Sequence, residues 1–85
     1  MSSEAGLDAL DQVRQMIASH NLPFLKQRKF NGIFNAMEMQ IEDEDYSVEV
    51  VNHLGQALLA LARGYQLETS PVEGALNDLQ RRLKA

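Results

Sequence analysis

The stretch from Val48 to Tyr65 constrains the fold of this chain more than any other part of its sequence. Its apolar residues recur at steps of three and four, which is the spacing of one face of an α-helix. At about 100° per residue, they cover an arc of about 200°. These residues are Val48, Val50, Val51, Leu54, Ala57, Leu58, Leu59, Leu61, Ala62 and Tyr65. A helix that is apolar over more than half its circumference is expected to lie centrally, with other helices against more than one side.

Local signals mark both ends of this helix. Ser47 can accept a hydrogen bond from a first-turn amide, and Glu49 follows where the helix dipole favours a negative charge. Gly64 is the type of residue that ends a helix in the left-handed conformation. The sequence therefore predicts a helix from Ser47 to Arg63.

Two segments that precede this helix show the same spacing. One runs from Glu4 to Ser19 and ends before Pro23, because the residue before a proline avoids helical angles. The next begins near Pro23. The stripes are Leu7, Leu10, Val13 and Ile17 in the first segment, and Phe30, Ile33, Phe34, Met37 and Ile41 in the second. The pair Asn31-Gly32 is a turn signal, so the second segment is either one helix or a short helix over 24–29 followed by a longer one.

A fourth helix is predicted from Ser70. The residues Ser70-Pro71-Val72-Glu73 form a capping box, in which Ser70 is the N-cap and Glu73 reaches back to the Ser70 amide. The seam that follows is narrow and suits packing against one neighbour. It consists of Val72, Ala75, Leu76, Leu79 and Leu83.

Residues 37–50 also fit a β-hairpin, because Met37–Glu42 and Tyr46–Val50 both alternate between apolar and polar side chains. The intervening acidic run contains no glycine or asparagine and is poor turn chemistry, which favours the helical interpretation. We predict a single all-α domain over residues 1–85. It is a small four-helix bundle, or a five-helix bundle if the second helix is split, and the alternative is an α+β fold with the hairpin over 37–50.

Composition excludes several classes of protein. The 85 residues include no cysteine, which removes disulfides, thiolate nucleophiles and cysteine-ligated metals and favours a reducing, cytoplasmic location. No signal-peptide pattern opens the sequence, and the longest strongly apolar stretch, 57–62, is far below the ~20 residues of a membrane span. The net charge of −4 disfavours nonspecific binding to nucleic acid or to anionic lipid.

The sequence shows no arrangement of catalytic or cofactor-binding residues. The glycines are too scattered for a phosphate loop, and no serine lies in a nucleophile elbow. His20 and His53 are not at a metal-ligand spacing. We therefore expect no enzymatic activity, no cofactor and no dedicated metal site.

The densest charge cluster consists of Glu42, Asp43, Glu44 and Asp45. A calcium-binding EF-hand loop that began at Asp43 would require glycine at its sixth position and glutamate at its twelfth, where Val48 and Leu54 stand. This excludes an EF-hand. A solvated loop between helices, a weak surface site for a divalent cation and a contact surface for a basic partner remain as alternatives.

Two apolar residues lie outside the predicted stripes. Met39 falls opposite the apolar stripe of its own helix, and Phe24 precedes that stripe. Methionine adapts to irregular surfaces and is common in binding patches. We predict a small non-catalytic interaction module, such as a regulator, adaptor, chaperone-like subunit or immunity-type inhibitor. Its partner is another protein or a second copy, and its contact surface includes Phe24, Met39 and the acidic run.

The alternative is a regulator associated with nucleic acid. Lys26, Arg28 and Lys29 lie between Phe24 and Phe30, and basic residues interleaved with aromatic ones can bind single strands. A variant of this alternative is an acidic mimic that blocks a DNA-binding protein through residues 42–45.

Overall fold

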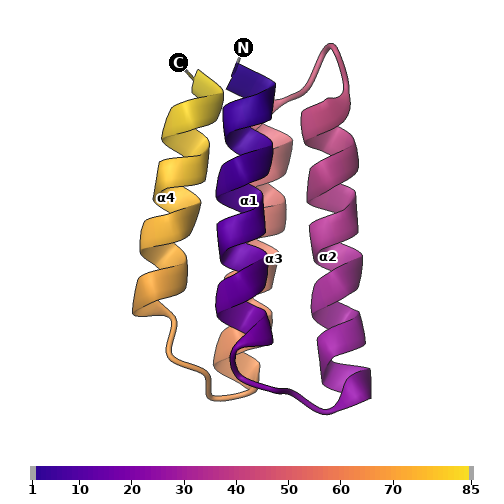
Figure 1. Cartoon of the computed structure of the whole chain (residues 1–85), viewed down its shortest axis with the longest axis vertical. Coiled ribbons are helices and arrows are strands. Elements are labelled where there is room, and N and C mark those ends of the chain that lie inside the picture. Colours follow the sequence, from indigo (N-terminus) through magenta and orange to yellow (C-terminus); the bar gives the residue numbers. More distant parts are fainter. Residues whose placement is uncertain (1, 85) are drawn as a thin grey trace.

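The computed structural model of this chain describes residues 2–84, and it forms a bundle of four α-helices (Figure 1). The helices are α1 (Ser2–Ala18), α2 (Phe24–Glu42), α3 (Val48–Gly64) and α4 (Ser70–Lys84). Short links over 19–23, 43–47 and 65–69 join them, and residues 2–84 contain no β-strand. The predicted all-α four-helix bundle is confirmed. Among these helices, none is both long and apolar enough to cross a membrane.

The helices alternate in direction, so the start of α1 and the end of α4 lie at the same end of the bundle (Figure 1). α1 packs against α2 and α4, and α3 packs against the same two helices from the other side of the core. The expectation that α3 has other helices against more than one side is confirmed, but the expectation that it lies centrally is wrong. It occupies one corner of the bundle, diagonal to α1, because its apolar arc is narrower than the sequence indicated. Val50 is 42% exposed, and Ala57 also faces solvent.

The core contains apolar side chains from all four helices, and no polar or charged residue of the described chain is buried with them. Each helix contributes one stripe at helical spacing, as the hydrophobic effect requires of an amphipathic helix in a bundle. The buried residues are Ala9, Leu10, Val13 and Ile17 from α1; Phe30, Phe34, Met37 and Ile41 from α2; Val51, Leu58, Leu59 and Ala62 from α3; and Val72, Leu79 and Leu83 from α4.

α2 is one continuous helix, so the first of the two alternatives for this segment is confirmed and the alternative with a break at Asn31-Gly32 is wrong. Phe30 and Phe34 lie one turn apart on either side of Gly32, and both are buried in the core. A break between them would turn one of these rings away from the core. Burial of a large aromatic side chain is worth about 1.5–3 kcal/mol, which outweighs the ~1 kcal/mol that glycine costs within a helix.

The alternative hairpin over 37–50 is also wrong. Met37 and Ile41 are both buried on the inner face of α2, and alternation in a strand would place them together with the exposed Met39 on one face. The link that follows α2 is held to α4, because the Tyr46 hydroxyl donates a hydrogen bond to the Leu83 carbonyl oxygen at 2.9 Å. Ser47 then caps α3 as predicted, since its hydroxyl oxygen accepts a hydrogen bond from the Val50 amide.

The chain leaves α3 differently from the expectation for Gly64. No described glycine has a positive φ, and the left-handed residue is Gln66, with φ of 60°. The Leu67 amide then donates to the Ala62 carbonyl oxygen at 2.9 Å. The left-handed position comes two residues later than predicted because Gly64 still belongs to the helix.

The predicted capping box at the start of α4 does not form. Ser70 is the first helical residue rather than the N-cap, and the Glu73 amide donates to the Thr69 carbonyl oxygen at 2.8 Å. The Glu73 carboxylate accepts a hydrogen bond from the Arg63 guanidinium of α3 at 2.9 Å. An ion-pair partner on the neighbouring helix thus replaces the local backbone partner.

α1 and α4 form the closest helix pair in the bundle. A Cβ atom placed on Gly6 would lie 2.5 Å from Cδ2 of Leu83, so the missing side chain of Gly6 gives the buried leucine its space. Near the same end, the Arg82 guanidinium donates to the Ala5 carbonyl oxygen at 3.3 Å. The opposite face of α4, toward α3, is packed less closely.

We expect Gly6→Val to lower the free energy of unfolding by about 1–3 kcal/mol, because the added methyl groups enter space that Leu83 occupies. The matched control is Gly74→Val in α4, where a Cβ atom would meet nothing within 4 Å. Urea unfolding of both variants measures the difference. Equal stability of the two variants would contradict the close packing of α1 on α4.

Candidate functional site

The predicted contact residues all belong to α2 or to the link that follows it. Phe24 is the first residue of α2 and is 75% exposed, whereas Met39 lies near the far end of the helix and is 74% exposed. The acidic residues follow, with Glu42 ending the helix and Asp43, Glu44 and Asp45 exposed in the link. The structure therefore places these residues on one helix and the link that follows it, although Phe24 and Met39 lie about 22 Å apart along the helix.

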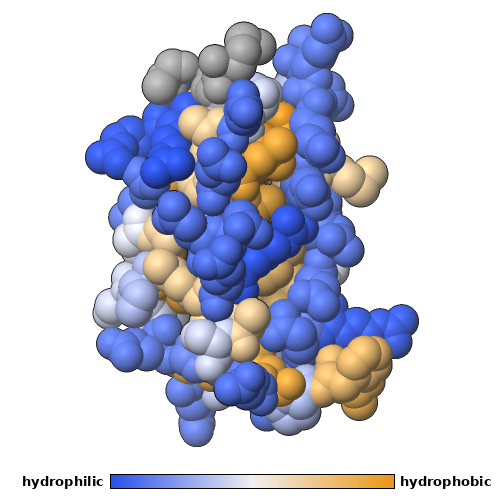
Figure 2. Space-filling view, viewed as in Figure 1, coloured by the Kyte–Doolittle hydropathy of each residue, from blue (hydrophilic) through white to orange (hydrophobic). Residues whose placement is uncertain are grey.

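Leu25 belongs to the same surface and was missed by the sequence prediction. It is 68% exposed, so that α2 carries three of the four large apolar side chains that are exposed in residues 2–84. In Figure 2, hydrophobic side chains protrude on the side of the molecule that α2 occupies, whereas hydrophilic residues cover most of the rest of this view.

Five exposed residues of α2 fall within one arc of about 80° and point away from the core. We call them the outer face of α2. They are Leu25, Arg28, Gly32, Ala36 and Met39. The stripe has apolar side chains toward both ends and small residues at its middle, where a Cβ atom on Gly32 would meet nothing within 4 Å.

Contacts with the neighbouring helices bound this face on both sides. On the α1 side, the Arg14 guanidinium pairs with the Glu38 carboxylate at 2.9 Å and also lies 5.8 Å from the centre of the Phe34 ring. On the α3 side, Nζ of Lys26 lies 4.9 Å from the centre of the Tyr65 ring, which is a cation–π contact. These contacts use side chains at the borders and leave the outer face of α2 uncovered.

Charge is distributed unevenly along α2. Arg28 and Lys29 are exposed in its first half, and Glu42 and Asp43 are exposed at its end. Among the described residues, neither Arg28 nor Glu42 takes part in an ion pair. The Asp43 carboxylate accepts a hydrogen bond from the Asp45 amide at 3.0 Å, which orders the start of the acidic link. The helix thus presents a basic end and an acidic end to solvent.

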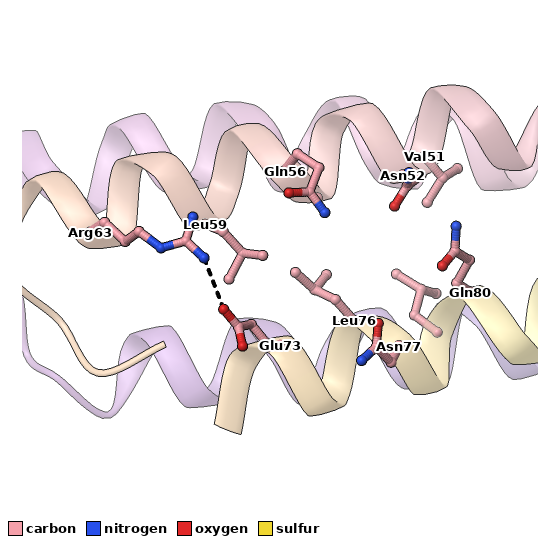
Figure 3. Close-up of a pocket in the computed structure, with 11 residues that line it drawn as sticks. Val51, Asn52, Gln56, Leu59, Arg63, Glu73, Leu76, Asn77 and Gln80 are labelled. Carbon is pink, nitrogen blue, oxygen red and sulfur yellow. Dashed lines mark hydrogen bonds and ion pairs between the residues drawn. The ribbon is translucent and has the colours of Figure 1, made fainter. Parts of the chain in front are cut away.

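A groove between α3 and α4 is the second surface feature, and it lies where these helices are packed loosely (Figure 3). Its volume is about 210 Å³. Apolar residues from both helices form its floor, and a Cβ atom on Gly55 would lie 3.5 Å from the Leu76 side chain. The groove is lined by Val51, Asn52, Gly55, Gln56, Leu59, Arg63, Glu73, Leu76, Asn77, Leu79 and Gln80.

The polar groups of this groove are mostly neutral amides. Four Asn and Gln side chains lie along it, and the ion pair between Arg63 and Glu73 spans the two helices at one end (Figure 3). An amide donates and accepts hydrogen bonds but does not transfer protons at neutral pH. The groove therefore offers hydrogen-bonding and apolar contacts, and it does not assemble the predicted contact residues.

The acidic link does not form a preorganised metal site in the described structure. No group of three or more His, Cys, Asp or Glu side chains within the residues described could hold a metal ion. The two histidines are on different parts of the surface, with His20 after α1 and His53 on α3, and both are exposed.

Comparison with known proteins identifies no relative. The chain matches no protein-family model, no curated protein sequence and no solved structure.

The sequence contains a signal for the outer face of α2, but the stronger apolar pattern of the inner stripe makes it hard to recognise. Leu25, Gly32 and Met39 are spaced by seven residues, which is the spacing of a seam between two helices. Gly32 instead suggests a break, because glycine is usually unfavourable within a helix. The groove between α3 and α4 leaves no comparable signal, because it results from the distance between two helices.

We expect Met39→Gln to change the free energy of unfolding by less than about 0.5 kcal/mol, because Met39 is exposed. Met37→Gln is the matched comparison, two residues earlier on the buried face. It should cost about 3 kcal/mol or more, because it places an amide in an apolar core. Urea unfolding of dilute protein measures both. A large loss for Met39→Gln would show that this residue serves the fold and not a surface contact.

Proposed function

We propose that this protein is a small non-catalytic interaction module that binds a protein partner through the outer face of α2. The observation that supports the proposal is the placement of Leu25 and Met39 on this face, with Phe24 exposed beside Leu25, outside a core that is already complete without them. Large apolar residues exposed on one helix indicate a contact surface more strongly than single scattered residues do. A cytoplasmic location is part of the proposal, since the chain has no cysteine.

The four-helix core suits this role because it holds α2 rigid before binding. The inner stripe of α2 is anchored by Phe30, Phe34, Met37 and Ile41, all of which are buried. A partner therefore meets a helix that is already ordered, and less conformational entropy is lost on binding. Arg28, in the first half of α2, and Glu42, at its end, would direct the orientation of the partner.

The geometry supports the nucleic-acid alternative less well. Of the three clustered basic residues, Lys26 already lies against the Tyr65 ring, which leaves Arg28 and Lys29. The acidic residues 42–45 follow on the same helix and its link, so a polyanion that lies along α2 would meet repulsion at one end. The acidic-mimic variant would use this end alone and would leave the exposed apolar residues without a role.

Site-specific photo-crosslinking in the native host tests the proposal. A photoreactive phenylalanine analogue is placed at Leu25 or Met39, and at Gln12 of α1 or Ala57 of α3 as exposed control positions. We expect a discrete covalent adduct from the two positions on α2 and none from the controls. Absence of an adduct from both α2 positions, or the same adducts from all four positions, would contradict the proposal.

A further inference from the structure

We propose that the partner of the outer face of α2 is the same face of a second copy of this chain. The two α2 helices would pack antiparallel, about a two-fold axis that passes between Gly32 and Ala36. This inference rests on the proposed function and names its partner. It is supported by the distribution of charge along α2, by the seven-residue spacing of its exposed seam, and by the small residues at the middle of that seam.

Charge complementarity selects the antiparallel orientation. Arg28 and Glu42 are separated by about 21 Å along one helix, so they cannot pair within a chain. In an antiparallel second copy, the basic half of each α2 lies beside the acidic end of the other. A parallel copy would place Arg28 beside Arg28 and Glu42 beside Glu42, and juxtaposed like charges oppose association. A two-fold contact requires a surface that complements itself, which this arrangement of charge provides.

One register satisfies the charges and the apolar residues together. About the midpoint between Gly32 and Ala36, Arg28 lies about 9 Å along the helix in one direction and Glu42 about 12 Å in the other. In the antiparallel copy these two residues come to the same end, offset by about 3 Å, which an arginine side chain can span. Two equivalent ion pairs then form, one on each side of the axis.

In the same register, Met39 of one copy lies at the level of Lys29 in the other. The residues around that level form a hole of the kind that receives a side chain in helix–helix packing. The hole is formed by Leu25, Arg28, Lys29 and Gly32. Met39 would therefore cover Leu25 and the methylene groups of Lys29, so that both exposed apolar residues leave water.

The middle of the seam allows the two helices to approach closely. Gly32 has no side chain and Ala36 has only a methyl group, and these two residues face each other across the proposed axis. Within the described chain, no other residue occupies the space beside Gly32, since a Cβ atom there would meet no atom within 4 Å. This contrasts with Gly6, because the Leu83 side chain fills the space where a side chain at Gly6 would lie. A second helix over Gly32 would use the space that the single chain leaves empty.

The first test is the mass of the full chain in solution, measured by sedimentation equilibrium over a concentration series. We expect a species of twice the 9.5 kDa chain mass. Gly32→Gln should weaken its formation about 10- to 100-fold, because a side chain would enter the contact. Gly74→Gln is the matched control on α4, where a Cβ atom also meets nothing, and it should leave dimerisation unchanged. A monomer at all concentrations, or a dimer equally tolerant of both substitutions, would overturn the proposal.

Charge reversal tests the register. Arg28→Glu gives a chain with Glu at both paired positions, and Glu42→Arg gives a chain with Arg at both. Each variant alone should dimerise about tenfold or more weakly than the original chain, because both pairs are repulsive. An equimolar mixture of the two should form a heterodimer, and the double variant should regain homodimers. If mixing restores no association, the antiparallel register is wrong.

The photo-crosslinking experiment separates this inference from the proposed function. An adduct from Met39 with twice the chain mass supports the second copy. An adduct of any other mass, with a monomeric chain in sedimentation, would overturn the proposal that the partner is a second copy. The proposal that the protein is an interaction module would still hold. No adduct from either α2 position, with a monomeric chain, overturns both.

Discussion

The burial of one apolar stripe from each helix in a core without polar side chains is the constraint on which this structure depends. The hydrophobic effect has no preferred direction. It therefore determines which face of each helix turns inward, whereas the shapes of the side chains determine which helices pack closely together. The burial of Phe30 and Phe34 in this core stabilises α2 enough for the helix to continue through Gly32. The continuity of α2, and therefore of its outer face, follows from burial on its inner side.

Differences in side-chain size then make the bundle asymmetric. Gly6 lets α4 approach α1 closely, and Leu83 fills the space that this glycine provides. α4 therefore packs more loosely against α3, and the groove in Figure 3 is left between them. The Arg63–Glu73 ion pair spans the looser side, where both side chains are partly exposed and contribute little to stability.

α2 differs from the other helices because it carries three of the four large apolar side chains that are exposed in residues 2–84. Its inner stripe is completed by α1 and α3, whereas its outer face shows a second, sparser seam. The helix is also basic in its first half and acidic at its end. Exposed apolar residues carry a cost in solubility, and glycine within a helix carries a cost in stability. A second helix on this face would explain both features at once, which no contact within the described chain does.

The sequence by itself determined the four helices and the inner face of each, because helical periodicity is a local property of the chain. The spacing of Phe30, Phe34, Met37 and Ile41 is enough to predict their burial, and the position of Met39 opposite them is enough to predict its exposure. Tertiary structure decided what depends on neighbours. It placed α3 at a corner, moved the left-handed residue from Gly64 to Gln66, and turned Glu73 toward Arg63. It also opened the groove beside α4 and left the outer face of α2 uncovered, because the distances between helices depend on which side chains meet across them.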